Sequence, residues 1–372
     1  MFRIDGALVK ALEAEDFAYA LVRVSGKFAL RSVARRMDTV AVFPFINAVG
    51  IRCDMKDAER LSGMPGVESV TAQARVTALS DDEAGTERGA PAYAEKEAEK
   101  EEGDAAVLGA ARRMTGRGVT LCVMDTGVSP HSDLSLPRDR IVAFEDRIAG
   151  REFPYDDNGH GTFVAGVAAG SGFLSGGPPK GLAPAASVVG VKVIGESGET
   201  GAFKILEGMQ WLFDNCGRLG VKVAVMSFGA QPAETADPLK LGAEMLVRRG
   251  VTVVCAAGNS GIGGLRSPGI SPEVITVGAV DDALAVAPFS SSGVYQGVRR
   301  PDVYAPGVHI KGIEAGGTYS HMTGTSASAP LVAGACCLLH EAFPRLYPRD
   351  CKRLLLSACR KVNGIRVFTG FG

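Results

Sequence analysis

The chain has 372 residues, which is enough for one enzyme domain and a small accessory domain. Hydrophobic residues make up 46% and charged residues 22%, the balance of a soluble globular protein. The 40 basic and 41 acidic residues leave a formal net charge of −1, which gives no sign of a nucleic-acid-binding surface. No apolar run reaches the ~18 residues of a membrane-spanning helix, so no membrane span is expected.

The start of the chain and its cysteines bear on where the protein works. The first residues, MFRIDGALVKALEAEDFAYA, lack the apolar core and cleavage site of a secretory signal. This favours a cytoplasmic location over the alternative, export by an unrecognised route. The eight cysteines form no zinc-type spacing, and Cys122 and Cys255 lie inside apolar runs. We therefore expect all of them to be reduced thiols.

Residues 15–79 alternate between strand and helix patterns. The order is strand, helix, strand, strand, helix, strand, which is typical of a small ferredoxin-like α+β domain. The predicted strands are Phe17–Val24, Val40–Phe45, Ala48–Cys53 and Val67–Thr71, and the predicted helices are Lys27–Met37 and Met55–Ser62. We assign residues 1–79 to this domain.

Residues 80–104 contain almost no bulky apolar side chains. Such a segment cannot bury enough surface to offset the entropy lost on ordering. We predict a flexible acidic linker there, followed by a second domain over residues 105–372.

In the second domain, short Val-rich apolar runs alternate with helical stretches. Such runs are typical of strands buried on both faces of a parallel sheet, so we predict a doubly wound α/β fold. The predicted strands are Val119–Met124, Val188–Ile194, Val221–Met226, Val251–Ala256 and Val274–Val280. The predicted helices are Gly161–Ala169, Phe203–Cys216, Pro238–Arg249 and Ala329–Phe343, the last with Pro330 in its first turn.

Four polar residues stand where such a fold binds ligands, near strand ends and helix starts. Asp125 directly follows the first run, in D-T-G, and Asn259 closely follows the fourth, in A-A-G-N. His160, in D-N-G-H-G-T, and Ser326, in G-T-S-A-S-A-P, each lie where a loop enters a helix. We expect these four residues to form one site.

These residue types suit nucleophilic catalysis. A serine hydroxyl is a weak nucleophile unless a base removes its proton, and histidine, with a pKa of ~6.5, is suited to that task. A buried carboxylate can hold the other ring nitrogen and stabilise the imidazolium. The amide of Asn259 and the backbone N–H of Ser326 could stabilise a developing oxyanion.

In this order, the four motifs resemble those of the subtilisin-like serine protease family, and the likeness runs from about Gly109 to Gly372. The segment D-V-Y-A-P-G at residues 302–307 is also similar to a family segment. The resemblance implies a serine endopeptidase that works through an acyl-enzyme on Ser326. His160 would be the general base and acid, Asp125 would orient it, and Asn259 would lie in the oxyanion hole.

The resemblance also implies how substrate binds. A protein or peptide would lie as an extended strand between segments near residues 195–201 and 227–230. The residues expected to bind it are Gly195, Gly198, Ser227, Phe228, Gly229, Ala256, Ala257 and Gly258. Beyond substrates and its own N-terminal domain we expect no partner, so we expect a monomer.

The N-terminal block resembles the family's propeptide in F-I-N-A-V at residues 45–49 and P-G-V-E-S-V at residues 65–70. Such a domain would act as an intramolecular chaperone and inhibitor, with its last strand entering the active site. By this resemblance we predict self-cleavage near Leu79 and Ser80, within residues 75–104.

The sequence requires no metal or cofactor. Many family members hold calcium near the loop that corresponds to Ser171–Lys180, but this loop, SGFLSGGPPK, lacks Asn and Asp oxygen ligands. Calcium is therefore unsupported there. Two other departures from the family pattern, Ala327 and Leu331, lie away from the chemistry.

Several alternatives stay open from sequence. D-T-G also occurs in aspartic proteases, but these need two such aspartates and the chain has one D-T-G. A regulatory protein that keeps the fold without activity, or a protease held latent by its N-terminal domain, would carry the same motifs. His131 and Asp133 could form a metal site or structure a loop, and Glu196 and Glu199 could favour basic substrate residues or be solvated charges.

Overall fold

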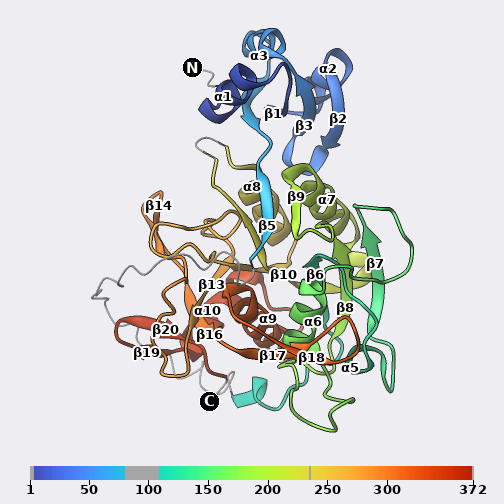
Figure 1. Ribbon diagram of the computed structural model, residues 1–372, viewed down its shortest axis with the longest axis vertical. Helices are drawn as coiled ribbons and strands as arrows, with labels where there is room; N and C mark the ends of the chain where they lie inside the picture. The colour runs from blue at the N-terminus through green and yellow to red at the C-terminus, as the bar shows by residue number, and fades with distance from the viewer. Residues whose placement is uncertain (1–3, 80–108, 234–235, 371–372) are drawn as a thin grey trace.

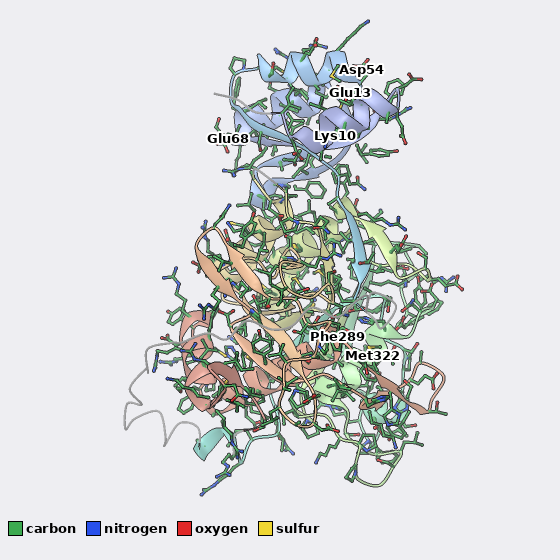
Figure 2. All side chains as sticks on the ribbon, turned by 60° about the vertical axis from the view of Figure 1, so that its left-hand side comes forward. Lys10, Glu13, Asp54, Glu68, Phe289 and Met322 are labelled. Atoms are coloured by element: carbon green, nitrogen blue, oxygen red, sulfur yellow. The ribbon has the colours of Figure 1, made fainter. Side chains whose placement is uncertain are left out.

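Figure 1 shows the computed structural model, which describes residues 4–79, 109–233 and 236–370. A smaller N-terminal domain (residues 4–79) stands on a larger C-terminal domain (residues 109–370), and strand β5 (Arg75–Ala78) descends from the first into the second. Figure 2 shows Lys10, Glu13 and Asp54 in the smaller domain and Phe289 and Met322 in the larger one. The predicted linker, residues 80–104, and Ser80 with it, lie outside the described residues.

The N-terminal domain is a four-stranded antiparallel sheet in the order β2-β3-β1-β4, the arrangement of a ferredoxin-like fold. Its elements are α1 (Gly6–Ala14), β1 (Ala18–Val24), α2 (Lys27–Arg36), β2 (Asp38–Phe43), η1 (Pro44–Ile46), β3 (Ala48–Cys53), α3 (Met55–Ser62) and β4 (Val67–Ala72). Along β1, Ala20 and Val22 pack with the helices in one core, whereas Leu21 joins a core shared with the C-terminal domain. The period of two along the strand thus gives the sheet two buried faces.

Two elements of this domain lie outside the predicted pattern, and several strand and helix bounds differ slightly from the predicted ones. Helix α1 begins where the Asp5 side chain accepts a hydrogen bond from the Ala7 amide at 3.3 Å, and it buries Leu8 and Leu12. Strand β5 was too short to be predicted on its own. Strand β2 ends at Phe43 rather than Phe45 because Pro44 opens a 3₁₀ turn.

The C-terminal domain is built on a nine-stranded, mainly parallel sheet in the order β19-β20-β16-β13-β12-β10-β6-β8-β7. The strands of this sheet are β6 (Thr120–Asp125), β7 (Ile141–Asp146), β8 (Ser187–Lys192), β10 (Val221–Met226), β12 (Thr252–Ala256), β13 (Ile275–Val280), β16 (Val303–Pro306), β19 (Arg360–Val362) and β20 (Ile365–Val367). The helices are α5 (Ser132–Ser135), α6 (His160–Ala169), α7 (Ala202–Leu219), α8 (Pro238–Arg248), α9 (Thr325–Ala342) and α10 (Pro348–Ala358). Short outer strands complete the domain: β9 (Glu199–Gly201), β11 (Phe228–Ala230), β14 (Gly293–Tyr295), β15 (Val298–Arg300), β17 (Ile310–Ile313) and β18 (Tyr319–Met322).

The Val-rich runs form strands covered on both faces, as the doubly wound prediction requires. Along β6, Leu121 and Val123 pack into the core that contains α6, α9 and α10. Cys122 and Met124 pack into the opposite core, which contains α7 and α8. This two-sided burial explains why the strands read as continuous apolar runs rather than as alternating ones.

The N-terminal sheet rests on the outer surface of helices α7 and α8. The ring centroids of Phe43 and Phe203 lie 5.9 Å apart, and those of Phe45 and Phe213 lie 5.8 Å apart. The backbone amide of Phe45 donates a hydrogen bond to Gln210 Oε1 at 3.1 Å. This aromatic contact orients the N-terminal domain so that β5 points at the carboxyl ends of the sheet strands.

Among the helices of the described residues, we find none whose length and hydrophobicity would let it cross a membrane.

Candidate active site

Strand β5 lies between two strands of the C-terminal domain and pairs antiparallel with both, in the order β11-β5-β9. On one side Ala78 is opposite Phe228, and on the other Thr77 is opposite Glu199. The Ala78 amide donates to the Gly198 carbonyl oxygen at 2.9 Å. Main-chain pairing of this kind gives an extended peptide affinity with only modest preference for its sequence.

Leu79, the next residue, brings its carbonyl group to Ser326. Its amide donates to the Ser227 carbonyl oxygen at 3.2 Å, and its carbonyl oxygen accepts a hydrogen bond from Ser326 Oγ. The Leu79 side chain is fully buried. A Cβ added to Gly229 would make only ordinary contact with Leu79 Cδ1, at 3.6 Å, but would lie 2.5 Å from Arg266 Cβ, so it is Arg266 that requires glycine there. Burial of a leucine side chain stabilises this arrangement by roughly 2 kcal/mol.

Asp125 and His160 form a buried hydrogen-bonded pair. Asp125 ends β6, His160 is the first residue of α6, and Asp125 Oδ1 lies 2.7 Å from His160 Nδ1. Both side chains are almost wholly excluded from solvent. The carboxylate therefore fixes the ring and leaves Nε2 as the nitrogen that can exchange a proton with a substrate or nucleophile.

The electrostatic surroundings favour the charged form of the imidazole. Burial alone lowers the pKa of His160, but the charge of Asp125, its hydrogen bond and the charge of Asp156 raise it, with a further contribution from the Leu79 main chain. The net result is a pKa above the ordinary value for histidine. The site thus stabilises the imidazolium that forms when His160 accepts a proton.

A second carboxylate supports the start of α6. Asp156 Oδ1 accepts hydrogen bonds from Thr126 Oγ1 at 2.9 Å and from the Gly159 amide at 2.8 Å, while Oδ2 accepts from the Thr162 amide at 2.8 Å. Gly161 is required for the close approach of the helix, because a Cβ there would lie 2.1 Å from the Gly127 carbonyl oxygen. Sequence reasoning missed Asp156, although its place four residues before His160 was a signal.

Ser326 lies in the first turn of α9, which begins at Thr325 and not at Ala329 as predicted. Pro330 therefore lies inside the helix, where it cannot donate to the carbonyl oxygen four residues earlier, that of Ser326. Ser227 Oγ donates to that oxygen at 3.3 Å and so replaces the missing bond. The helix can start early because the donor that Pro330 lacks is supplied by Ser227, which directly precedes β11.

Asn259 lies close to the Leu79 carbonyl group and to Ser326 Oγ. Its Oδ1 accepts from the Thr325 amide at 2.9 Å and from Thr325 Oγ1 at 2.8 Å, which leaves Nδ2 as the outward donor. A Cβ added to Gly324, whose φ is 149°, would lie 3.0 Å from Asn259 Nδ2, 3.1 Å from the Leu79 carbonyl oxygen and 3.2 Å from Ser326 Oγ. These three groups therefore meet in one small volume that only glycine leaves open.

The other residues expected to bind substrate surround β5 to different degrees. Gly198, Ser227, Phe228 and Gly229 lie directly along the paired strand or its last residue, as described above. Ala256 ends β12 and belongs to the same apolar core as Leu79, and Ala257 and Gly258 follow it toward Asn259. Gly195 accepts the Gly198 amide at 3.1 Å and so shapes the turn beside β5 rather than pairing with it.

Glu199 forms an ion pair with Arg75, the first residue of β5. The side chains remain 40% and 71% exposed, respectively, so this pair contributes little to affinity.

A buried carboxylate, that of Asp133, holds the loop at Ser171–Lys180. Its Oδ1 accepts a hydrogen bond from the Leu174 amide at 2.8 Å and its Oδ2 accepts one from Tyr319 Oη at 2.9 Å, so both oxygens have protein partners. Residue His131 accepts from the Asp133 amide through Nδ1 at 3.0 Å. These contacts favour the loop-structuring alternative for His131 and Asp133.

Over residues 4–79, 109–233 and 236–370, no three His, Cys, Asp or Glu side chains are grouped to hold a metal ion. The eight cysteines are buried, and none forms a disulfide bond.

Comparison with known proteins gives this geometry a context. The model of the Subtilase family matches residues 116–372. Serine protease AprX from Bacillus subtilis (strain 168) is 39% identical to this chain, and the match covers 67% of this chain and 62% of AprX. Subtilisin Savinase from Lederbergia lenta is 37% identical, and that match covers 63% of this chain and 80% of Savinase. The chain thus spans less than two thirds of AprX.

Among solved structures, a crystal structure of a cold-adapted subtilisin-like serine proteinase matches with a TM-score of 0.60 and 30% identity. The match covers 68% of this chain and 89% of that one.

We predict that His160 titrates above the ~6.5 of an ordinary histidine in a chain that keeps β5 in place. The folded state favours the protonated ring, so the imidazolium persists to higher pH and is lost only as the pH rises through the raised pKa. ¹⁵N NMR of the imidazole in the Ser326→Ala chain measures this. In the Asp125→Asn control the titration should move to lower pH, and an unchanged value would contradict the assigned cause.

Proposed function

This chain belongs to the subtilase family, and we propose that it is a serine endopeptidase in which Ser326, His160 and Asp125 hydrolyse peptide bonds. The observation that carries the proposal is the Leu79 carbonyl group, which lies against Ser326 Oγ beside the Asp125–His160 pair. A main-chain carbonyl in this place is what a peptide substrate would present.

In the proposed reaction, Ser326 Oγ attacks the carbonyl carbon while His160 Nε2 takes the hydroxyl proton. Asp125 stabilises the imidazolium without accepting the proton itself. As the C–N bond breaks, His160 returns the proton to the leaving amine and an ester on Ser326 remains. Water then attacks this ester, with His160 again as base, and releases the carboxylate and the free serine.

The charge that develops on the carbonyl oxygen requires donors that are already oriented. Asn259 Nδ2 and the Ser326 backbone N–H, in the first turn of α9, are the two proposed donors. Thr325 fixes the amide of Asn259 in the orientation that this task needs. This role of Thr325 was not predicted from sequence.

For the N-terminal domain we propose the roles of intramolecular chaperone and inhibitor, removed by self-cleavage between Leu79 and Ser80. The pairing of β5 with β9 and β11 supports inhibition, because an occupying strand excludes other peptides. The aromatic contact with α7 supports a chaperone role, because it covers helix surface that would otherwise have to fold unassisted. We propose that the protein acts as a monomer and that its other partners are the proteins or peptides that it cleaves.

Ser326→Ala should abolish peptide hydrolysis and leave the chain uncut, because Ser326 Oγ is the proposed nucleophile and the group that meets the Leu79 carbonyl. Wild-type protein should react with a fluorophosphonate probe, and the variant should not. The measurement is peptide-library cleavage followed by mass spectrometry, with probe labelling alongside. Wild-type activity in the variant, or an unlabelled and inactive wild type, would refute the proposed function.

Asn259→Ala should lower kcat by about 10²–10³ while leaving KM nearly unchanged, as expected for a donor that acts mainly in the transition state. Steady-state kinetics on a peptide substrate measure both constants. Ser260→Ala is the matched control, because it changes the next residue without touching the proposed oxyanion position. A larger effect on KM than on kcat in Asn259→Ala would count against the assigned role.

A further inference from the structure

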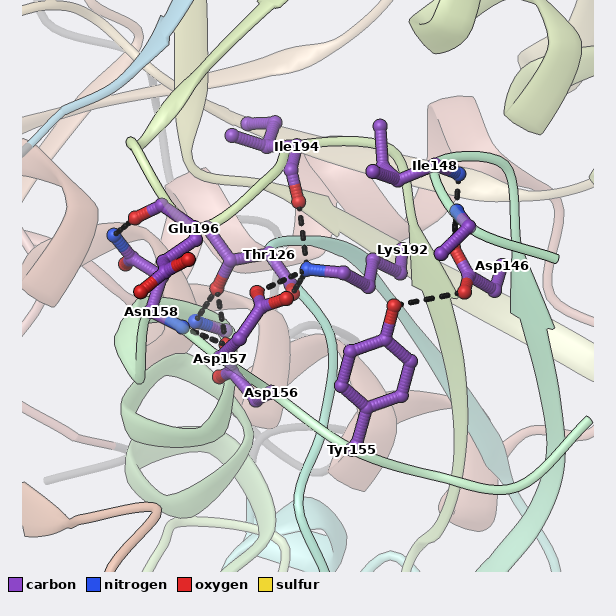
Figure 3. A network of polar contacts seen from close by, with 12 residues as sticks. Thr126, Asp146, Ile148, Tyr155, Asp156, Asp157, Asn158, Lys192, Ile194 and Glu196 are labelled. Carbon is purple, nitrogen blue, oxygen red and sulfur yellow. Dashed lines mark hydrogen bonds and ion pairs between the residues drawn. The ribbon is translucent and has the colours of Figure 1, made fainter. Parts of the chain in front are cut away.

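A buried lysine, Lys192, lies in a network of polar contacts (Figure 3). Lys192 ends β8 and stands beside Asp125 in the parallel pairing of β6 with β8. Its side chain is 0% exposed. The proposed reaction does not use this charge, so its burial needs a separate explanation.

The ammonium group of Lys192 has an oxygen partner for each of its three N–H donors. It donates to Asp157 Oδ1 at 2.6 Å, to the Ile194 carbonyl oxygen at 2.9 Å and to the Thr126 carbonyl oxygen. A buried ammonium is strongly unfavourable unless it is paired in this complete way. The ammonium group therefore fixes the positions of the three oxygen atoms that accept its hydrogen bonds.

Each partner belongs to a different part of the site. Thr126 follows Asp125 directly. Asp157 lies in the loop before His160, next to Asn158, whose Oδ1 accepts the His160 amide at 3.2 Å. Ile194 leads into the turn that carries Gly198, the partner of β5.

A rigid support backs the lysine on its other side. The Tyr155 ring centroid lies 5.1 Å from Lys192 Nζ, and Tyr155 Oη donates to Asp146 Oδ2 at 2.8 Å. The Asp146 carboxylate also accepts the amides of Ile148 at 2.8 Å and Ala149 at 3.0 Å. Figure 3 shows this chain of contacts running from β7 to the ammonium group.

We propose that Lys192 is a positioning residue. It fixes three segments relative to one another: the end of β6 that carries Asp125, the loop before His160, and the segment after Ile194 that pairs with β5. This inference rests on the proposed function, since it assigns Lys192 to the same peptide-hydrolysing site. Lys192 touches neither the substrate strand nor the reacting atoms, so it acts through the segments that do. Loss of the ammonium group would disturb both the orientation of the reactive groups and the pairing with an extended substrate.

The test uses the full chain and two chromogenic substrates. One carries the sequence of residues 75–79, Arg-Val-Thr-Ala-Leu, before a p-nitroanilide group, and spans the paired segment. The other is acetyl-leucine p-nitroanilide, which reaches only the Leu79 position. Rates are expressed per active site, counted by fluorophosphonate titration, so that unfolded protein does not enter the comparison.

Lys192→Met should lower kcat/KM on the pentapeptide by about 10²-fold, because the reacting groups and the paired segment are both displaced. The loss on acetyl-leucine p-nitroanilide should be about 10-fold, because this substrate does not use the paired segment. The preference for the longer substrate should therefore fall. A lysine that only stabilised the fold would lower the melting temperature and leave both rates per active site unchanged.

Arg140→Met is the matched control. Arg140 is also a buried cation, and its guanidinium donates to the carbonyl oxygens of Ala169 and Ala186 at 2.8 Å each, away from the reactive groups. This variant should lose thermal stability but keep both rates and their ratio. If Lys192→Met matches Arg140→Met, the positioning proposal is overturned.

Asp157→Asn decides the question if Lys192→Met does not fold. Its carboxylate is 34% exposed, so the protein should tolerate the change. We expect a several-fold loss of kcat/KM, larger on the pentapeptide, and unchanged rates would overturn the proposal. A wild-type chain that cleaves neither substrate would instead contradict the proposed function.

Discussion

The pairing of β5 between β9 and β11 is the constraint on which the arrangement of the whole site depends. It is made of main-chain hydrogen bonds, so it fixes where the backbone runs while leaving most side chains free. Because Ala78 and Leu79 are bound to Gly198 and Ser227, the Leu79 carbonyl group has one accessible position. That position is the one where Ser326 and Asn259 converge, so a backbone interaction decides which carbonyl group meets Ser326.

The fold supplies the reactive groups to this position from separate layers. Asp125 comes from the end of a buried strand, and His160 and Ser326 come from the first turns of α6 and α9. The two helices pack side by side on one face of the sheet, within one apolar core. The polar groups beneath them, Asp156 and Lys192, are buried because they bond to the segments that carry the reactive side chains. The same packing of α6 and α9 on the sheet therefore stabilises the core and fixes the positions of the site residues.

Much of this was predictable from sequence, for a physical reason. Strands buried on both faces must be apolar throughout, so β6, β8, β10, β12 and β13 were predicted close to their observed bounds, and the fold class followed. Asp125, His160, Asn259 and Ser326 stand at the ends of elements, where a change from apolar to polar residues is visible. Four characteristic motifs in family order then favoured one chemistry.

What escaped prediction depends on contacts between distant segments. Strand β5 has four residues and no pattern of its own, and it is a strand only because β9 and β11 pair with it. The early start of α9 depends on Ser227, which lies about a hundred residues before Ser326 and supplies the bond that Pro330 cannot make. Lys192 was not singled out from sequence, because two of its three partners, Thr126 and Asp157, are distant from it in the chain.

The position of the cut bond tests the central claim most directly. The claim is that Leu79, and no neighbouring residue, presents its carbonyl group to Ser326. Intact-mass analysis of the N-terminal fragment released from the purified wild-type chain reads the new carboxyl terminus without further assumption. A fragment that ends at Leu79 is the expected result. A fragment ending at another residue of β5, or a fully active chain that remains uncut, would contradict the account.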